Sequence, residues 1–289
     1  MKKNTIIILI LLFEVFSSCK SKEMNYVNYY NEIYSADSIM RFRNDTIKAL
    51  KQYRKTFRKF EPKNNERIKE FETFIKLSDK YKRNFGGTKN LHKLIKLNAL
   101  NWEDKKKDKD FIKLNKKYGI DSLRIEREVN NWKTNLNKVL IDSFKIALER
   151  DQQGRHYDLP LVKKNVNKNA SFLIWTFENY GFPTVDKIGW FPTPTFLSHM
   201  IESEKYKYFK EKIPEYIKKG ECSPRDYAML VDYGLEIIDK KEYTYYGVNG
   251  KEIIDSTLVN RNRKSIGLPS LKHKAKIWKD LEQKNKHYH

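Results

Sequence analysis

The sequence predicts a mainly α-helical protein, with a helical N-terminal region followed by a helical domain that carries one small β-hairpin. Apolar residues recur at helical spacing through most of the chain, and Ser, Asp, Pro and Gly supply helix start and stop signals. One Asn-Gly pair flanked by β-prone residues predicts the hairpin. The 289 residues are 39% hydrophobic and 33% charged, which suits helices with broad solvated faces.

The net charge of +22 comes from 59 basic and 37 acidic residues. Lysine accounts for most of the excess and is spread from end to end, and no nucleic-acid-binding motif accompanies it. We therefore expect no specific nucleic-acid partner. The chain also lacks a metal-ligand spacing and a glycine-rich phosphate loop, so we expect neither a metal site nor a cofactor.

The first residues have the pattern of a targeting signal. Lys2-Lys3 precede the apolar run 6–13, and Ser17-Ser18 precede Cys19. This pattern resembles a bacterial lipoprotein signal, which implies that residues 1–18 are removed and that Cys19 is lipidated. The protein would then be held on a membrane of the bacterial cell envelope, facing the periplasm or the surface. The alternative is an ordinary secretory signal with a chance cysteine.

Residues 19–36 are polar and are predicted to form a tether, and residues 37–150 a lysine-rich helical region. Trp132 is expected in the core, with an exposed platform for a ligand as the alternative. Start signals, stop signals and apolar spacing in this region predict helices over residues 38–60, 65–84, 88–97, 113–118 and 121–150, with a charged turn at 104–110.

Residues 151–289 are predicted to form the second helical unit. A helix over 158–180 ends at Gly181, and Ser223-Pro224-Arg225-Asp226 is a strong helix start. Further helices are expected from Pro194, over 203–219 and from Ser270. Tyr243 to Ile254, with Asn249-Gly250 at the turn, predicts the hairpin, and a basic loop is expected after Val259.

A set of polar residues and glycines in residues 151–268 has a characteristic order and spacing: Asp151-Gln152 with Arg155, Asn169, Gly181-Phe182-Pro183, His199, Asp232, Tyr246-Gly247, Arg263 and Gly267. In these residues the chain resembles a bacterial family of uncharacterised proteins, domain of unknown function 6624. Ser198 and Tyr233 stand where the family usually has glutamine and arginine, so this would be a divergent member. The resemblance implies no particular activity.

Three functions are compatible with this pattern. We favour a ligand-binding or interaction module, in which the polar residues line one cleft and Trp190 and Tyr245 stack against a ligand. The second is a hydrolase in which His199 acts as acid or base, oriented by Asp151 or Asp232. The third is an envelope scaffold without a site. The residues predicted to bind a polar ligand are Asp151, Gln152, Arg155, Asn169, His199, Asp232, Tyr246 and Arg263.

Overall fold

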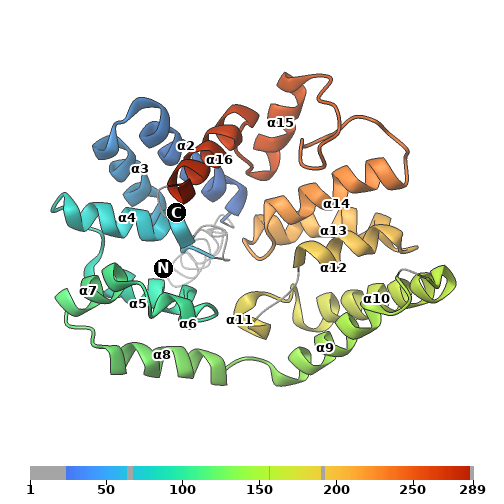
Figure 1. Cartoon of the computed structure of the whole chain (residues 1–289), viewed down its shortest axis with the longest axis horizontal. Helices are drawn as coiled ribbons and strands as arrows, with labels where there is room; N and C mark the ends of the chain where they lie inside the picture. The colour runs from blue at the N-terminus through green and yellow to red at the C-terminus, as the bar shows by residue number, and fades with distance from the viewer. Residues whose placement is uncertain (1–23, 64–67, 156, 190–192, 287–289) are drawn as a thin grey trace, which may run out of the picture.

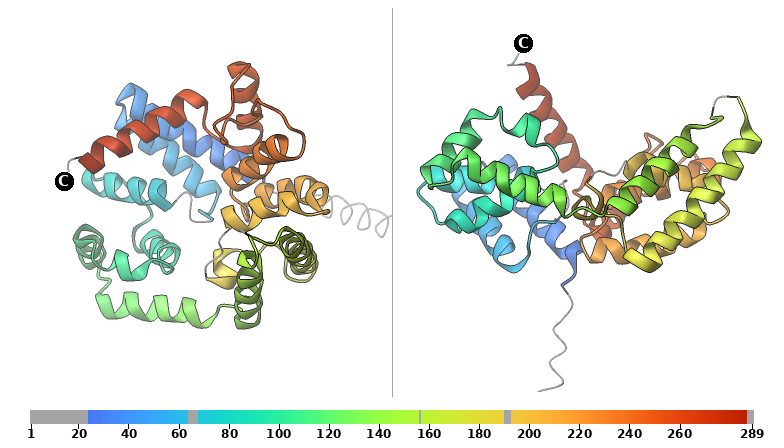
Figure 2. Two further views of the ribbon diagram at one scale, coloured as in Figure 1. Left: turned by 45° about the vertical axis from the view of Figure 1, so that its right-hand side comes forward. Right: turned by 90° about the horizontal axis from the view of Figure 1, so that it is seen from below.

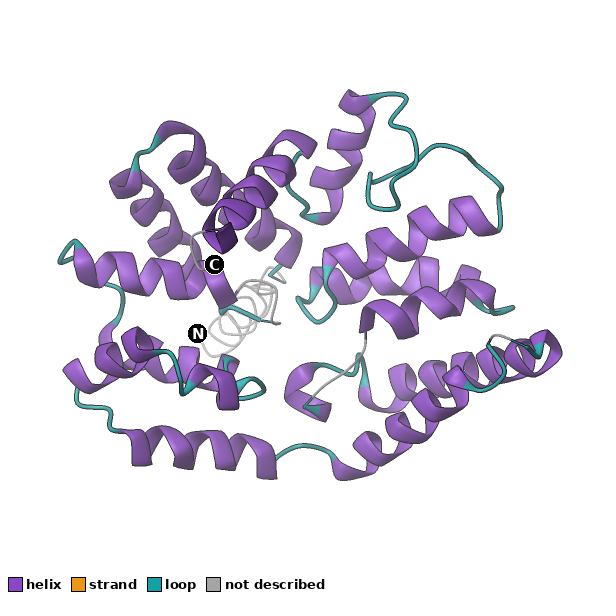
Figure 3. Ribbon diagram, in the orientation of Figure 1, coloured by secondary structure: helices purple, strands orange, loops and turns teal. Residues whose placement is uncertain are grey.

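A computed structural model describes residues 24–63, 68–155, 157–189 and 193–286. The predicted signal peptide (1–18), Cys19 and Trp190 lie outside the described residues. The described chain is mainly helical, as predicted, and contains no β-strand (Figure 3).

Helices α2 to α9 occupy the sequence up to residue 152 (Figure 1). Their bounds are α2 Tyr26–Arg43, α3 Thr46–Lys59, α4 Ile68–Lys80, α5 Gly87–Leu97, α6 Trp102–Lys105, α7 Lys109–Lys117, α8 Ser122–Thr134 and α9 Lys138–Gln152. The remaining helices are α10 Leu159–Tyr180, α11 Val185–Ile188, α12 Thr193–His199, the 3-10 turn η2 Met200–Glu202, α13 Tyr206–Lys218, α14 Pro224–Ile237, α15 Ser256–Ile266 and α16 Leu271–Lys286.

The tether predicted for residues 19–36 is wrong from residue 26 onward, where α2 begins. The side chain of Asn25 caps this helix by accepting a hydrogen bond from the amide of Val27 at 2.9 Å. Tyr29, Tyr30 and Ile33 are buried, because the aromatic face of α2 packs against α3. Asn44, whose backbone is in the left-handed conformation, then separates α2 from α3, where a single helix was predicted over residues 38–60.

The long helix predicted over 121–150 is also divided, into α8 and α9. The side chain of Asn137 caps α9 by accepting from the amide of Leu140 at 3.0 Å. The amide of Asn137 instead donates to the carbonyl of Lys187 at 2.7 Å, which ties this break to α11. The domain boundary predicted between residues 150 and 151 falls inside α9, and one buried apolar cluster includes residues from both sides of it.

The sequence signals in the second half are confirmed where capping chemistry is strong. Asp158 caps α10, which ends at Gly181, and Ser223 caps α14 with Pro224 at its first position. The basic loop predicted after Val259 is wrong, because Asp255 caps α15 and Gly267 ends it in the left-handed conformation.

The predicted β-hairpin is wrong. Tyr243 and Glu252 form only an isolated bridge. The reason is that the amides of Tyr245, Tyr246 and Val248 all donate to the carboxylate of Asp232, at 2.8, 2.8 and 2.9 Å. Amides bound to a side chain cannot join a strand ladder, so the segment folds as a loop around Asp232.

Helix α16 packs against α2, so the last described helix lies beside the first described one (Figures 1 and 2). His273 of α16 bonds to Asp37 of α2 at 2.7 Å, and Arg41 bridges to Asp280 at 2.5 Å. Burial raises the pKa of Asp37, but hydrogen bonds from His273 and Arg41 outweigh it and hold that pKa below its usual value. The described helices include none that could span a bilayer.

Candidate ligand site at Asp151, Arg155 and His199

The end of helix α9 positions the first polar cluster. Asp151 lies in its last turn with 2% of its surface exposed. Gly154 follows at φ +76°, a conformation that favours glycine, and the chain then turns back. This turn lets the guanidinium of Arg155 fold onto Asp151, with Nη2 at 2.8 Å from Oδ1 and Nε at 2.7 Å from the main-chain oxygen.

His199, the last residue of α12, completes the cluster from the other side. Its Nδ1 lies 2.7 Å from Oδ2 of Asp151. Gln152 Nε2 donates to the same Oδ2 at 2.8 Å. One buried carboxylate therefore holds an imidazole, a guanidinium and an amide.

Charge and burial set the ionisation of this carboxylate. Burial raises the pKa of Asp151, but the hydrogen bonds and positive charges of His199 and Arg155 outweigh burial and lower the pKa below its usual value. Asp151 is therefore ionised at neutral pH and fixes both partners by charge-assisted hydrogen bonds.

The outer side of the cluster is open to solvent. The side chains of His199 and Arg155 are 20% and 15% exposed, against 1% for Asp151. Glu202 lies beside them, with Oε1 at 3.4 Å from Arg155 Nη1. Sequence reasoning missed Glu202, although it stands three residues after His199 and η2 continues directly from α12.

Asn169 does not face this opening. It is fully buried on α10, where its Oδ1 accepts from Arg150 at 2.9 Å and its Nδ2 donates to the carbonyl of Ala147 at 3.0 Å. It braces α10 against α9, so its predicted role in ligand binding is wrong.

Asp232 forms the centre of a second, separate cluster. Its side chain is fully buried, and its oxygens accept the three loop amides and the hydroxyl of Thr244, which lies 2.5 Å from Oδ2. Every part of the carboxylate is thus engaged with the loop. It has neither the access nor the free oxygen that a catalytic acid or base needs.

Tyr246 and Arg263 belong to this second cluster and are buried as well. Arg263 donates to the carbonyl of Tyr246 at 2.6 Å and to that of Pro269 at 2.5 Å. Burial lowers the pKa of Arg263, while the charges of Tyr34 and Asp232 act in the opposite direction. Arg263 therefore joins the loop to the end of α15 and does not point at a ligand.

The residues predicted to line one cleft fall into two hydrogen-bonded clusters. Within the described chain, no hydrogen bond or ion pair directly joins Asp232, Tyr246 or Arg263 to the Asp151 cluster. Tyr245, predicted to stack against a ligand, lies on the Asp232 loop and pairs with Tyr246 at 4.9 Å between ring centres. Of the predicted residues, Asp151, Gln152, Arg155 and His199 make the candidate site, with Glu202 beside them.

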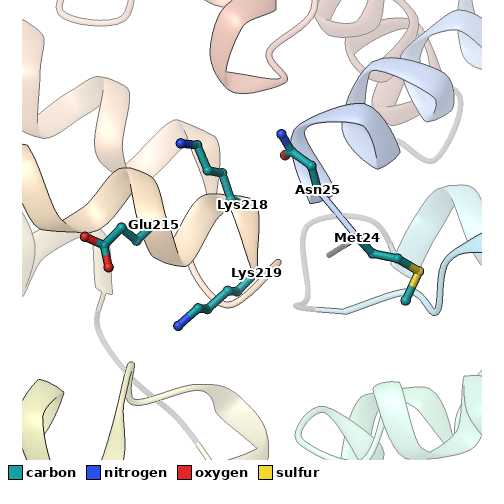
Figure 4. A pocket seen from close by; sticks show the side chains of 5 residues that line it. All are labelled: Met24, Asn25, Glu215, Lys218 and Lys219. Atoms are coloured by element: carbon teal, nitrogen blue, oxygen red, sulfur yellow. The ribbon is translucent and has the colours of Figure 1, made fainter. Parts of the chain in front are cut away.

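A pocket of about 330 Å³ lies elsewhere, between the start of α2 and the end of α13. Met24 and Asn25 form one wall, and Glu215, Lys218 and Lys219 form the other (Figure 4). None of the residues predicted to bind a ligand lines it.

Comparison with known families found no matching family model, and comparisons with curated proteins and with solved structures found no significant match.

Proposed function

We propose that this protein is a lipid-anchored envelope protein that binds a polar ligand at Asp151, Gln152, Arg155 and His199. The observation that carries the proposal is the pairing of a buried Asp151 with a partly exposed His199 and Arg155. The buried carboxylate fixes the two outer side chains, and preorganised donors and acceptors give a site its affinity and selectivity. A dipeptide fits these groups, since Arg155 favours its carboxylate, and Glu202 and Nε2 of His199 favour its ammonium group.

The proposed anchor is a lipid on Cys19. Met24 follows Cys19 by five positions, so an extended chain would keep the start of α2 within about 17 Å of the lipid. Lys63, Lys218 and Lys219 lie at that end of the molecule, and Lys63 sits over the ring of Tyr26 at 5.0 Å. Cations there suit an anionic leaflet. Replacing Cys19 with serine is expected to move the protein from the membrane fraction to the soluble fraction.

The ligand site is tested by thermal shift with alanyl-glutamate, citrate and inorganic phosphate as probes. At about 100 times Kd a bound probe raises the melting temperature by roughly 5 °C. We expect His199→Ala and Arg155→Ala to lose this shift. Lys164→Ala, which removes an exposed cation from α10, is expected to keep it. Equal shifts in all four proteins, or no shift with any probe, would favour an envelope scaffold without a site.

A hydrolase is the second candidate, because Asp151 binds Nδ1 of His199. In the neutral ring this arrangement places the proton on Nδ1 and leaves the lone pair on Nε2, as a general base requires. Hydrolysis of p-nitrophenyl acetate tests it. A general base at this position predicts that His199→Ala and Asp151→Asn each lower turnover by about a hundredfold or more. If the protein hydrolyses the ester no faster than buffer does, the hydrolase is excluded and ligand binding remains the proposed function.

We also propose that residues 151–268 are a divergent form of the uncharacterised family that they resemble. The close association of Asp151, Gln152, Arg155 and His199 supports this, because these residues come from two separate parts of the shared pattern.

A further inference from the structure

A second groove, of about 430 Å³, lies where helix α5, the end of α8 and α11 meet. Polar side chains and one indole line it: His92, Glu128, Asn131, Trp132, Asn135 and Asp186. It shares no residue with the Asp151 cluster. Figure 1 shows α11 close to the turn between α8 and α9.

Helices α8 and α11 form one wall of the groove, and hydrogen bonds and packing join them to each other. Trp132 Nε1 donates to Asp186 Oδ1 at 3.2 Å, which sets the orientation of the indole. The amide of Asn137 donates to the carbonyl of Lys187 at 2.7 Å. At Gly189 a Cβ would come within 2.8 Å of Leu136, so the turn after α8 packs directly on the end of α11. Trp132 thus packs against the core while it lines the groove.

A histidine–carboxylate pair joins α5 to α8 within the groove. His92 Nδ1 lies 2.6 Å from Glu128 Oε1, and these two side chains are 23% and 20% exposed. Oε2 of Glu128 is buried and has no hydrogen-bond partner among the described residues, so a ligand in the groove would meet the other atoms of this pair.

The charges of the lining cancel. Lys96 and Arg124 are matched by Glu128 and Asp186 when His92 is neutral. The chain as a whole has a net charge of +22, so this balance is local and the groove does not select a polyanion. Asn131 and Asn135, both exposed and one helical turn apart, add amide donors and acceptors.

We infer that this groove binds a neutral, hydroxyl-rich oligosaccharide. The apolar face of a sugar ring stacks on the indole of Trp132, and its hydroxyls exchange hydrogen bonds with the asparagine amides and the two carboxylates. The inference is independent of the site at His199, since the two sets of residues do not overlap.

Calorimetric titration with the soluble trimer of N-acetylglucosamine tests the inference on the purified full chain. We expect Trp132→Ala to weaken the association constant about tenfold or more, and Asn131→Ala to weaken it severalfold. Trp175→Ala and Trp278→Ala are matched controls, because these indoles are 44% and 51% exposed on other helices. Both controls are expected to bind as the wild type does.

Salt separates this binding from general attraction by the positive chain. Affinity for the neutral trimer should stay constant from about 50 to about 300 mM NaCl, whereas affinity for a polyanion falls steeply. No heat of binding, or equal affinity in Trp132→Ala, Asn131→Ala and wild type, would overturn the inference. His199→Ala should bind the trimer normally, so the two sites fail or succeed separately.

Discussion

Replacing Asp232 with asparagine should strongly destabilise the protein. The carboxylate is fully buried and accepts four hydrogen bonds that shape the loop from Thr244 to Val248. The new side chain keeps the shape but has one oxygen in place of two. If that oxygen keeps the amides of Tyr245 and Tyr246, the NH₂ group faces the amide of Val248, and two donors then oppose each other.

The size of the effect follows from these contacts. A hydrogen bond to a charged group contributes about 1.5–3 kcal/mol and a neutral one about 0.5–1.5, and an unpaired buried donor costs about 1–3 kcal/mol. Losing the acceptor for Val248 and weakening the other bonds gives about 3 kcal/mol in the free energy of unfolding. In urea this corresponds to a fall of about 1 M in the midpoint.

Urea unfolding followed by far-ultraviolet circular dichroism measures this. Asp239→Asn is the matched control, because Asp239 is exposed just after α14, and it should change stability by less than about 0.5 kcal/mol. A midpoint for Asp232→Asn equal to that of the control would refute the assignment of Asp232 to structure and would reopen it as a catalytic candidate.

Three further predictions concern other positions. Gly189→Ala should cost about 2 kcal/mol, from positive φ and the close leucine, whereas Gly250→Ala, with open space around its Cβ, should cost about 1 kcal/mol; thermal denaturation compares them. The pKa of Asp151 is lower in the folded state, so the stability that its carboxylate contributes is complete above about pH 4 and is lost as pH falls through the folded pKa. The difference in urea midpoint between wild type and Asp151→Asn should therefore shrink toward about pH 3. A difference that grows as pH falls would contradict this prediction. His273→Ala should cost about 3 kcal/mol in urea unfolding, because it removes a partner of the buried Asp37; an unchanged midpoint would refute this.

Helix positions were predictable where local chemistry decides them. Ser223 followed by Pro224, and Asp158 before α10, fix helix starts within a few residues. Breaks that depend on distant partners were not predictable. Apolar spacing continues through Asn135 to Asn137, and the break there combines the cap that Asn137 gives α9 with a contact to Lys187, fifty residues later.

All four residues of the candidate site were among the eight predicted, but the sequence could not separate them from the other four. Asp151, Gln152 and Arg155 are close in sequence, and His199 could be paired with Asp151 as one of two options. The sequence could not distinguish Asp232 from the site residues. A carboxylate at the edge of a helix face gives the same sequence pattern whether it binds a ligand or a loop. The loop amides that engage it belong to a segment whose β-prone side chains indicated a hairpin.

The most direct test of the central claim, a dyad in which Asp151 orients His199 for a ligand, is the tautomer of His199. Long-range ¹H–¹⁵N correlation spectra of the neutral ring distinguish a proton on Nδ1 from one on Nε2. We predict the proton on Nδ1 in the wild type, with this preference reduced in Asp151→Asn. A proton on Nε2 in the wild type, or identical spectra for the two proteins, would contradict the dyad.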